Sequence, residues 1–316
     1  MKRSSLVIGT RGSELALWQS EFVAGALRRF YPGVAVSLKR IETRGDRERE
    51  TPLPGIGGKG LFTAELEAAL AAGAIDLAVH SYKDLPVEVT PAFTIGAVPV
   101  RARVYDVLVA RGGFDLAGLP AGARVGTSSL RRVAQLRAVR PDLDVVPVRG
   151  NVPTRLAKVL RTESDVGYHA VVVAEAGLER LGLLRASYQR LPFAVMLPAP
   201  AQGALAVQCR ADDRDVLEML RPLDDEESRV SVEAERTFLG ALEAGCRLPV
   251  AAFARRDGDE LVMDGRVLDP TGQSIVQVSG RLPYAGIPHA IELGNRLAEE
   301  ALAGGAHALL EMALLL

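Results

Sequence analysis

The segment HSYKD, from His80 to Asp84, holds the residues best suited to chemistry, and it directly follows the apolar run IDLAV. A carboxylate such as Asp84, next to a cation such as Lys83, stays ionised and can stabilise a cationic intermediate, or it can move a proton if burial raises its pKa. A plainer interpretation is that Asp84 caps a turn, Lys83 pairs with it and His80 is a semi-buried residue whose hydrogen bonds are satisfied. The spacing alone leaves both interpretations open.

The two cysteines lie in different settings. Cys209 is in the apolar run GALAVQCR, which predicts an inert core thiol. Cys246 is in EAGCRLPV, where Arg247 favours the thiolate and the negative end of the preceding helix-like run opposes it, so charge does not decide its reactivity. The chain has no CxxC pair and its 4 histidines are scattered, so we expect neither a zinc site nor a disulfide framework.

Three segments share one plan, in which a strand-like run ends, a loop supplies arginine or serine, and a helix-like run begins. Their polar residues are Arg11 and Ser13, then Thr127, Ser128, Ser129, Arg131 and Arg132, then Arg149, Asn151 and Arg155. Positive helix ends attract anions, and a guanidinium can hold a carboxylate with two hydrogen bonds. Ser13, Ser129 and Asn151 could instead be helix N-caps. Three loops at strand ends together predict a small ligand with several negative groups.

The loop GIGGKGLF around Lys59 contains one of only five lysines among 38 basic residues. It is not a nucleotide-binding P-loop, because the GxxxxGK[ST] pattern needs glycine at Leu53 and Ser or Thr at Gly60. We therefore expect Lys59 to contact an anion without forming a nucleotide site.

The elements that must position these residues change along the chain. As far as about Arg221, short apolar runs alternate with helical patterns, as in ELALWQSEFVAGALRRF, which predicts α/β architecture with parallel strands. In that helix Leu15, Trp18, Phe22 and Leu27 recur at helical spacing. A long helix, the strand-like runs LPVAAFARR, ELVMDGRVLD and SIVQVSGRL, and two amphipathic helices follow. This part predicts a small α+β domain with an antiparallel sheet.

Composition excludes several classes of protein. The chain has 316 residues, 48% of them hydrophobic and 24% charged, which is typical of a soluble protein of two or three domains. A net charge of -1 and 5% aromatic residues argue against a nucleic-acid binder. No run approaches the roughly 20 apolar residues of a membrane span, and the start lacks a signal peptide pattern. We expect a cytoplasmic protein that binds neither nucleic acid nor membrane.

Taken in order, these segments resemble those of the hydroxymethylbilane synthases, also called porphobilinogen deaminases. The matching pieces are RGSELALWQ, TRGD, GGKGLFTAELE, DLAVHSYKDLP, VGTSSLRR, RGNVPTRL, AGLERLGL, PAPAQGALAVQCR and EAGCRLPV. The resemblance implies a monomer with two periplasmic-binding-protein-like α/β domains around a cleft, at 1–98 with 196–219 and at 103–193. A C-terminal α+β domain at 220–316, with a three-stranded antiparallel sheet, would carry Cys246.

The resemblance also implies an activity. The enzyme would deaminate four porphobilinogen molecules and join them head to tail on a dipyrromethane cofactor, which Cys246 holds through a thioether, before hydrolysis releases hydroxymethylbilane for tetrapyrrole and heme biosynthesis. Asp84 would stabilise the azafulvene cation that remains when ammonia leaves, without any metal. Besides Cys246, the implied cofactor-binding residues are Lys83, Asp84, Ser129, Arg131 and Arg132. The implied substrate-binding residues are Arg11, Ser13, Lys59, Arg149, Arg155 and Arg180.

Three residues depart from the family pattern. Ala201 stands where glycine is usual, His169 where an acidic residue is common, and Arg247 where a neutral polar residue often follows the cysteine. Only Arg247 adjoins an implied site residue, because it follows Cys246 directly.

Two other functions are compatible with the arginine loops. A non-catalytic receptor for polycarboxylates would use the loops but would leave Asp84 and Cys246 without a task. An enzyme acting on phosphate esters would need an anion site, but the sequence offers neither a P-loop nor a carboxylate cluster for Mg²⁺.

Overall fold

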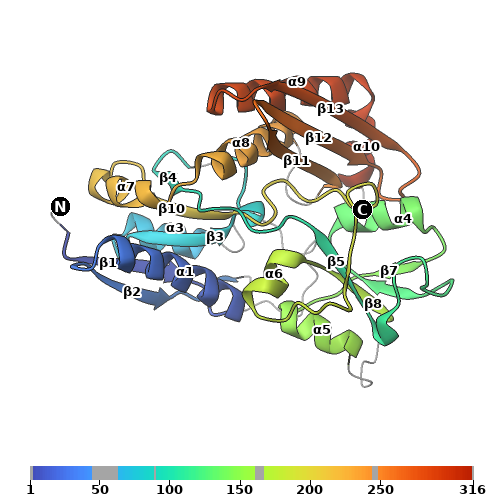
Figure 1. Ribbon diagram of the computed structural model, residues 1–316, viewed down its shortest axis with the longest axis horizontal. Helices are drawn as coiled ribbons and strands as arrows, with labels where there is room; N and C mark the ends of the chain where they lie inside the picture. The colour runs from blue at the N-terminus through green and yellow to red at the C-terminus, as the bar shows by residue number, and fades with distance from the viewer. Residues whose placement is uncertain (1–2, 45–62, 89, 161–166, 244–247, 315–316) are drawn as a thin grey trace. The chain divides into compact units, whose positions relative to one another are not determined.

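The chain forms two compact units in a computed structural model that describes residues 3–44, 63–88, 90–160, 167–243 and 248–314 (Figure 1). One unit consists of Met1–Arg101 with Ala204–Arg229, and the other of Ala102–Gly203 with Val230–Leu316. The expected division into three domains is finer than these two units and stays a prediction.

The first unit is built on a five-stranded sheet in the order β2-β1-β3-β10-β4. Its strands are β1 (Ser5–Thr10), β2 (Ala35–Arg40), β3 (Leu77–Ser81), β4 (Phe93–Ala97) and β10 (Leu205–Arg210). β1 is parallel to β2 and β3, whereas β10 is antiparallel to β3 and β4. The helical segments are α1 (Glu14–Phe30), α3 (Ala64–Ala71), η2 (Tyr82–Asp84), α7 (Arg214–Leu220) and η4 (Arg221–Leu223).

Helices cover both faces of this sheet, and its central strands β3 and β10 are almost entirely buried. Leu6 and Ile8 of β1 pack with Leu27 of α1 in one buried cluster, and α3 packs on the other face through Leu66. Between them, a Cβ on Gly9 would lie 2.4 Å from the Ile75 Cδ1 atom and 3.0 Å from the Leu66 Cδ2 atom. Glycine therefore allows the second layer to approach β1 closely.

Helix α1 shows the limit of the helical spacing in the sequence. Trp18 and Phe22, which share that spacing, are 38% and 39% exposed, and their rings stack with centroids 5.5 Å apart. The buried face is formed by smaller residues, including Ala16, Val23 and Ala24. The pattern predicted the helix correctly but not which aromatic residues enter the core.

The second unit contains another five-stranded sheet, in the order β7-β6-β8-β5-β9. Its strands are β5 (Asp106–Ala110), β6 (Arg124–Gly126), β7 (Asp144–Val146), β8 (Ala170–Ala174) and β9 (Gln189–Arg190). β6 is parallel to β7 and β8, whereas β5 is antiparallel to β8 and β9. The helical segments are η3 (Arg111–Gly113), α4 (Leu130–Val139), α5 (Val152–Leu160) and α6 (Glu175–Arg180).

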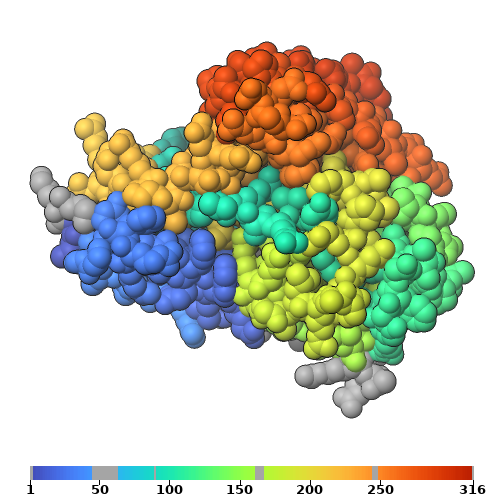
Figure 2. All heavy atoms as spheres, in the orientation of Figure 1, coloured from blue at the N-terminus to red at the C-terminus, as the bar shows by residue number. Residues whose placement is uncertain are grey.

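The same unit holds the C-terminal three-stranded antiparallel sheet of β11 (Val250–Asp257), β12 (Glu260–Leu268) and β13 (Ile275–Pro283). Helix α9 (Ile287–Ala303) packs on β12 and β13, and α10 (Ala306–Leu314) packs on β12. Figure 2 shows the C-terminal part of the chain, in orange and red, as closely packed atoms. Helix α8 (Glu226–Ala241) begins in the first unit and continues into the second.

The expected fold class is confirmed, with two five-stranded α/β sheets of one plan and a small antiparallel sheet with helices. In both larger sheets three strands are parallel, as expected, and the next strand is antiparallel. That strand enters shortly after the chain has crossed from the other unit, β5 after Arg101 and β10 after Gly203, so no crossover helix fixes its direction. None of the described helices is long and apolar enough to cross a membrane.

Candidate active site

Asp84 lies at the end of η2, immediately after the buried strand β3. Tyr82, two residues before it, and Leu85, directly after it, are 5% and 4% exposed, whereas the Asp84 side chain is exposed. The Tyr82 amide donates to the Ala204 carbonyl at 3.0 Å, and the Leu85 amide to the Tyr82 carbonyl at 3.1 Å. In the described part of the chain, the Asp84 carboxylate has neither a hydrogen bond nor an ion pair. The fold thus presents it on a fixed turn.

The plainer interpretation of this segment expected His80 to have its hydrogen bonds satisfied inside the protein, and this is confirmed. His80 is buried, and its Nε2 lies 3.0 Å from the Gln208 Oε1 atom, while the Gln208 amide donates to Glu67 at 3.0 Å. Burial lowers the pKa of His80 to about 4, the Gln208 hydrogen bond opposes this, and the nearby charge of Arg11 lowers the pKa further. His80 is therefore a neutral core residue behind the exposed carboxylate.

Arg11 and Ser13 lie in the loop between β1 and α1, at the same sheet edge as Asp84. β1 and β3 are parallel neighbours with Gly9 opposite Ala78, so their carboxyl ends meet. The Ser13 hydroxyl accepts a hydrogen bond from the Ala16 amide at 3.3 Å and caps α1, as the structural interpretation expected. Arg11 is half-buried in this loop and its charge acts on His80.

The second unit brings together the loops after β6 and β7. The Thr127 amide donates to the Val146 carbonyl at 2.9 Å, and the Ser128 hydroxyl to the Val148 carbonyl at 2.8 Å. Ser129 occupies the N-cap position of α4 but its side chain makes no capping hydrogen bond. Asn151 does cap its helix, because its Oδ1 accepts from the Thr154 amide at 3.0 Å. The N-cap alternative therefore applies to Asn151 and not to Ser129.

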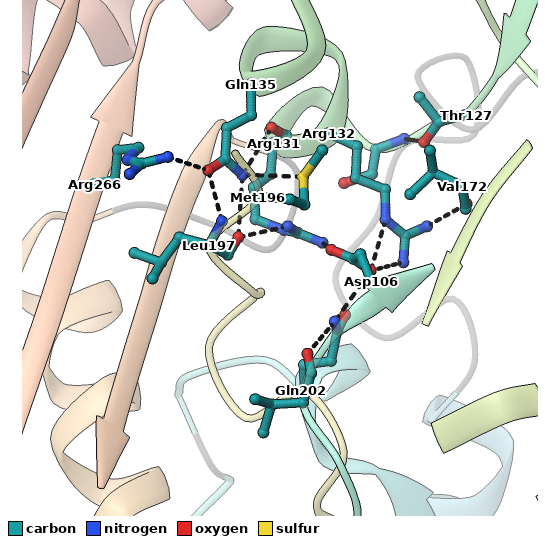
Figure 3. Close-up of polar contacts among 12 residues, drawn as sticks. Asp106, Thr127, Arg131, Arg132, Gln135, Val172, Met196, Leu197, Gln202 and Arg266 are labelled. Carbon is teal, nitrogen blue, oxygen red and sulfur yellow. Dashed lines mark hydrogen bonds and ion pairs between the residues drawn. The ribbon is translucent and has the colours of Figure 1, made fainter. Parts of the chain in front are cut away.

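Arg131 and Arg132 lie in the first turn of α4 and are almost fully buried, at 3% and 6% exposure. Figure 3 shows both guanidiniums around the carboxylate of Asp106, the first residue of β5. Arg131 Nη2 lies 2.8 Å from Asp106 Oδ2, and Arg132 Nη2 lies 2.6 Å from Asp106 Oδ1. Burial lowers the pKa of Arg131, Asp106 raises it and Arg132 lowers it again. Two guanidiniums and one carboxylate leave this cluster with one excess positive charge.

Asp106 is a residue that the sequence analysis missed. Its carboxylate is completely buried and also accepts a hydrogen bond from the Gln202 amide at 3.1 Å. The sequence did contain a signal for it, because an aspartate stands at the start of the apolar run DVLVA. An aspartate buried with such a run stays charged only if cations pair with it.

The remaining arginines of the predicted set lie on the second unit. Arg149 and Arg155 are half-buried in the loop after β7 and in α5, and Arg155 Nε donates to the Gly150 carbonyl at 2.8 Å. Arg180 ends α6 and donates to the Gly203 carbonyl at 2.6 Å. Burial lowers the pKa of Arg180 to about 10, and Glu179 opposes the shift. Arg180 therefore has a structural contact at the point where the chain leaves this unit.

Two predicted site residues, Lys59 and Cys246, lie outside the described residues, as does Arg247. Cys209 is fully buried as expected, and burial raises the pKa of its thiol to about 11. Within the described ranges, no group of three or more His, Cys, Asp or Glu side chains is placed to hold a metal ion.

The unusual Ala201 has a clear structural setting. It adopts a φ of 61°, in the left-handed region where glycine is favoured, and it is 1% exposed. Its amide donates to the Glu235 carboxylate at 2.6 Å. The glycine usual at this position thus matches a backbone requirement, which alanine meets at a cost in strain. His169 accepts a hydrogen bond from the Arg124 amide at 3.0 Å.

Comparison with known proteins identifies two family domains in the chain. The porphobilinogen deaminase dipyromethane cofactor binding domain matches residues 6–218, and the porphobilinogen deaminase C-terminal domain matches residues 230–303. A porphobilinogen deaminase of Roseiflexus sp. (strain RS-1) is 48% identical over 308 residues, which cover 98% of this chain and 99% of the relative. That of Desulforudis audaxviator (strain MP104C) is 51% identical over 305 residues, 96% of each chain. The chain therefore belongs to the porphobilinogen deaminase family.

Proposed function

We propose that this chain joins four porphobilinogen molecules head to tail and releases hydroxymethylbilane, as a transferase of tetrapyrrole biosynthesis. The observation that carries the proposal is the Asp84 carboxylate, exposed and without a partner in the described chain, on a turn fixed by Tyr82 and Leu85. The match of the chain to both family domains supports it.

Asp84 suits the deamination step. When ammonia leaves the aminomethyl group of porphobilinogen, positive charge spreads over the pyrrole ring and its N–H group becomes a stronger donor. A carboxylate that accepts this hydrogen bond binds the charged species more tightly than the neutral substrate, and that difference lowers the barrier. The backbone hydrogen bonds of Tyr82 and Leu85 hold Asp84 in place beforehand, so little reorganisation is needed.

The arginine cluster suits the carboxylates of a dipyrromethane cofactor, whose two pyrroles carry an acetate and a propionate each. Arg131 and Arg132 have one more positive charge than Asp106 balances, and Arg131 Nε is a buried donor with no partner in the described structure. Buried charge is stable only when it is compensated, so an added carboxylate would be favourable here. The residues of the cluster fit the cofactor.

We assign the cofactor contacts accordingly. Cys246 would hold dipyrromethane through a thioether, Asp84 would accept its pyrrole N–H groups, and its carboxylates would be bound by Lys83, Ser129, Arg131 and Arg132. Bound there, the cofactor supplies the electron-rich pyrrole carbon on which the product chain starts. The Ser129 hydroxyl supports this assignment because it is not used to cap α4.

The substrate carboxylates would be bound by the remaining cationic residues. Arg11 and Arg149 are half-buried at the carboxyl ends of strands, where their guanidinium groups can reach a small anion. Arg155 and Lys59 complete this set. Ser13 and Arg180 belong to the predicted set too. Ser13 caps α1 and Arg180 donates to the Gly203 carbonyl, so we assign them a structural contribution as well as a ligand contact.

The intact mass of the purified protein tests the function. The proposal predicts a mass excess of one dipyrromethane, a colour reaction with Ehrlich's aldehyde, and loss of both in Cys246→Ala. The matched control is Cys209→Ala, which removes the other cysteine, a fully buried residue of β10, and should keep the added mass. Active wild-type protein without the added mass would disprove the proposal.

The proposal also covers the location of the protein in the cell, its oligomeric state and its domain boundaries. We propose a cytoplasmic monomer that binds no nucleic acid, with two α/β domains at 1–98 with 196–219 and at 103–193, and a third domain at 220–316. Light scattering during size-exclusion chromatography measures the oligomeric state directly. Limited proteolysis, followed by mass measurement of the fragments, locates the boundaries.

A further inference from the structure

Asp106 occupies a position where three segments that are distant in sequence meet. It begins β5, its two oxygens contact Arg131 and Arg132 of α4, and the Gln202 amide donates to Oδ1 at 3.1 Å (Figure 3). The same Gln202 amide also donates to the Val104 carbonyl at 2.7 Å. One buried carboxylate therefore connects the start of α4 with the two segments near which the chain enters and leaves this unit.

The contacts of Asp106 determine the direction of both guanidiniums. Arg132 uses Nε at 3.1 Å and Nη2 at 2.6 Å on the same Asp106 oxygen, while its Nη1 donates to the Val172 carbonyl at 3.0 Å. Arg131 donates through Nη2 to Asp106 and through Nη1 to the Leu197 carbonyl at 2.7 Å. Both planar groups are thereby held at two points, which fixes the directions of the donors that remain.

A second hydrogen-bonded path leads from Arg131 to the C-terminal sheet. The Leu197 carbonyl accepts from Gln135 Nε2 at 3.0 Å, and the Leu197 amide donates to Gln135 Oε1 at 2.9 Å. Arg266 of β12 donates to the same Gln135 oxygen at 2.9 Å. The arginine pair and the sheet that begins shortly after Cys246 thus share one buried network (Figure 3).

We propose that Asp106 is a positioning residue for cofactor binding: it holds Arg131 and Arg132 in the orientation in which they receive a carboxylate. The inference rests on the proposed function. It adds that Asp106 affects cofactor binding more by orienting the two guanidiniums than by cancelling part of their positive charge. If cancellation of charge were its only effect, removing the Asp106 charge would make the site more attractive to anions.

A neighbouring carboxylate of the same unit provides a matched control. Glu175 follows β8 directly, is 1% exposed and also contacts two arginines, Arg190 through two hydrogen bonds and Arg103 at 3.7 Å. Its partners are 42% and 58% exposed and lie outside α4. Glu175→Gln therefore removes a buried carboxylate with two arginine contacts and leaves Arg131 and Arg132 in place.

The experiment follows cofactor attachment directly. Full-length apoproteins, produced in cells that cannot make porphobilinogen, are incubated with porphobilinogen, and intact mass is recorded over time, with circular dichroism as a check on folding. We expect Asp106→Asn to acquire the dipyrromethane mass about 10- to 100-fold more slowly than wild type, because small misplacements of binding groups cost about this much. Glu175→Gln should load at the wild-type rate.

Asp106→Glu distinguishes the effect of the carboxylate's position from the effect of its charge. It also keeps the test available if Asp106→Asn does not fold. It keeps the negative charge but moves the carboxylate by one methylene, so positioning predicts slower loading than wild type and faster loading than Asp106→Asn. Wild-type loading in Asp106→Glu, or equal or faster loading in Asp106→Asn, would overturn the inference. A wild-type apoprotein that gains no mass would instead refute the proposed function.

Discussion

Asp84 and Asp106 are the same side chain in two sheets of the same plan, and the fold uses them in opposite ways. Asp84 follows β3 of the first sheet and is exposed without a partner in the described residues. Asp106 begins β5 of the second sheet and is completely buried against two arginines. The difference indicates that one carboxylate is available to a ligand, whereas the other serves the protein's own structure.

The arginines near the two aspartates also differ in their surroundings. In the first unit, the charge of Arg11 helps to lower the pKa of His80, which burial keeps neutral, and Asp84 forms no ion pair within the described residues. In the second unit, the charges of Arg131 and Arg132 are partly balanced by Asp106. A buried charge is costly unless it is paired. The first unit avoids this cost because His80 stays uncharged, and the second reduces it because Asp106 pairs with Arg131 and Arg132.

The largest expected effect is that of Asp84→Ala on turnover. Loss of a main electrostatic catalyst should lower kcat by at least about 100- to 1,000-fold, while the free energy of unfolding changes little because the side chain is exposed. Steady-state kinetics with porphobilinogen and denaturant unfolding measure the two quantities. Near-normal turnover would remove Asp84 from the mechanism, and a large loss of stability would end the contrast with Asp106.

Asp106→Asn, unlike Asp84→Ala, should lower the free energy of unfolding markedly. Removing one partner of a buried ion pair typically costs about 3–5 kcal/mol, because the arginines remain buried without compensation. We expect a loss of this order in the free energy of unfolding, measured in urea. An unchanged midpoint would mean that water or a rearranged side chain already compensates the two arginines.

A pH titration tests the neutral state of His80. Its pKa in the folded protein, about 4, lies below its ordinary value of 6.5, so between these values the unfolded chain binds a proton that the folded chain does not. Stability from this residue is complete above about pH 6.5 and falls as the pH drops towards 4, by up to about 3 kcal/mol. Unfolding of wild type and His80→Gln should therefore diverge in pH dependence over this window. Parallel curves would show that His80 is not neutral by burial.

The smallest expected effect distinguishes two serines that occupy corresponding loops. Ser13→Ala should cost about 1 kcal/mol, because it removes the cap of α1, whereas Ser129→Ala should stay within about 0.5 kcal/mol, because Ser129 makes no cap. Thermal unfolding compares the pair. Because Ser129 is assigned to the cofactor, Ser129→Ala should also slow the gain of the dipyrromethane mass by the apoprotein. Equal stability losses in the two variants, with wild-type loading of Ser129→Ala, would contradict the assignment.

Local elements and the position of the candidate loops could be predicted from the sequence. The loops with Arg11, with Ser129 and with Arg149 were expected to follow strands, and each of them does, after β1, β6 and β7. The aromatic residues of α1 were less predictable. Trp18 and Phe22 follow the helical period, but the buried face belongs to residues such as Val23, because neighbouring strands determine which side of a helix is covered.

The sequence by itself determined the family, the fold class, and which residues stand where strands give way to helices, because these depend on local patterns and ordered motifs. Only the tertiary structure decided which charges are buried and paired. Asp106 lies 25 residues before Arg131 and 96 before Gln202, and they meet because β5 enters its sheet antiparallel to β8. No local pattern specifies such a contact, since burial and pairing depend on how distant segments pack.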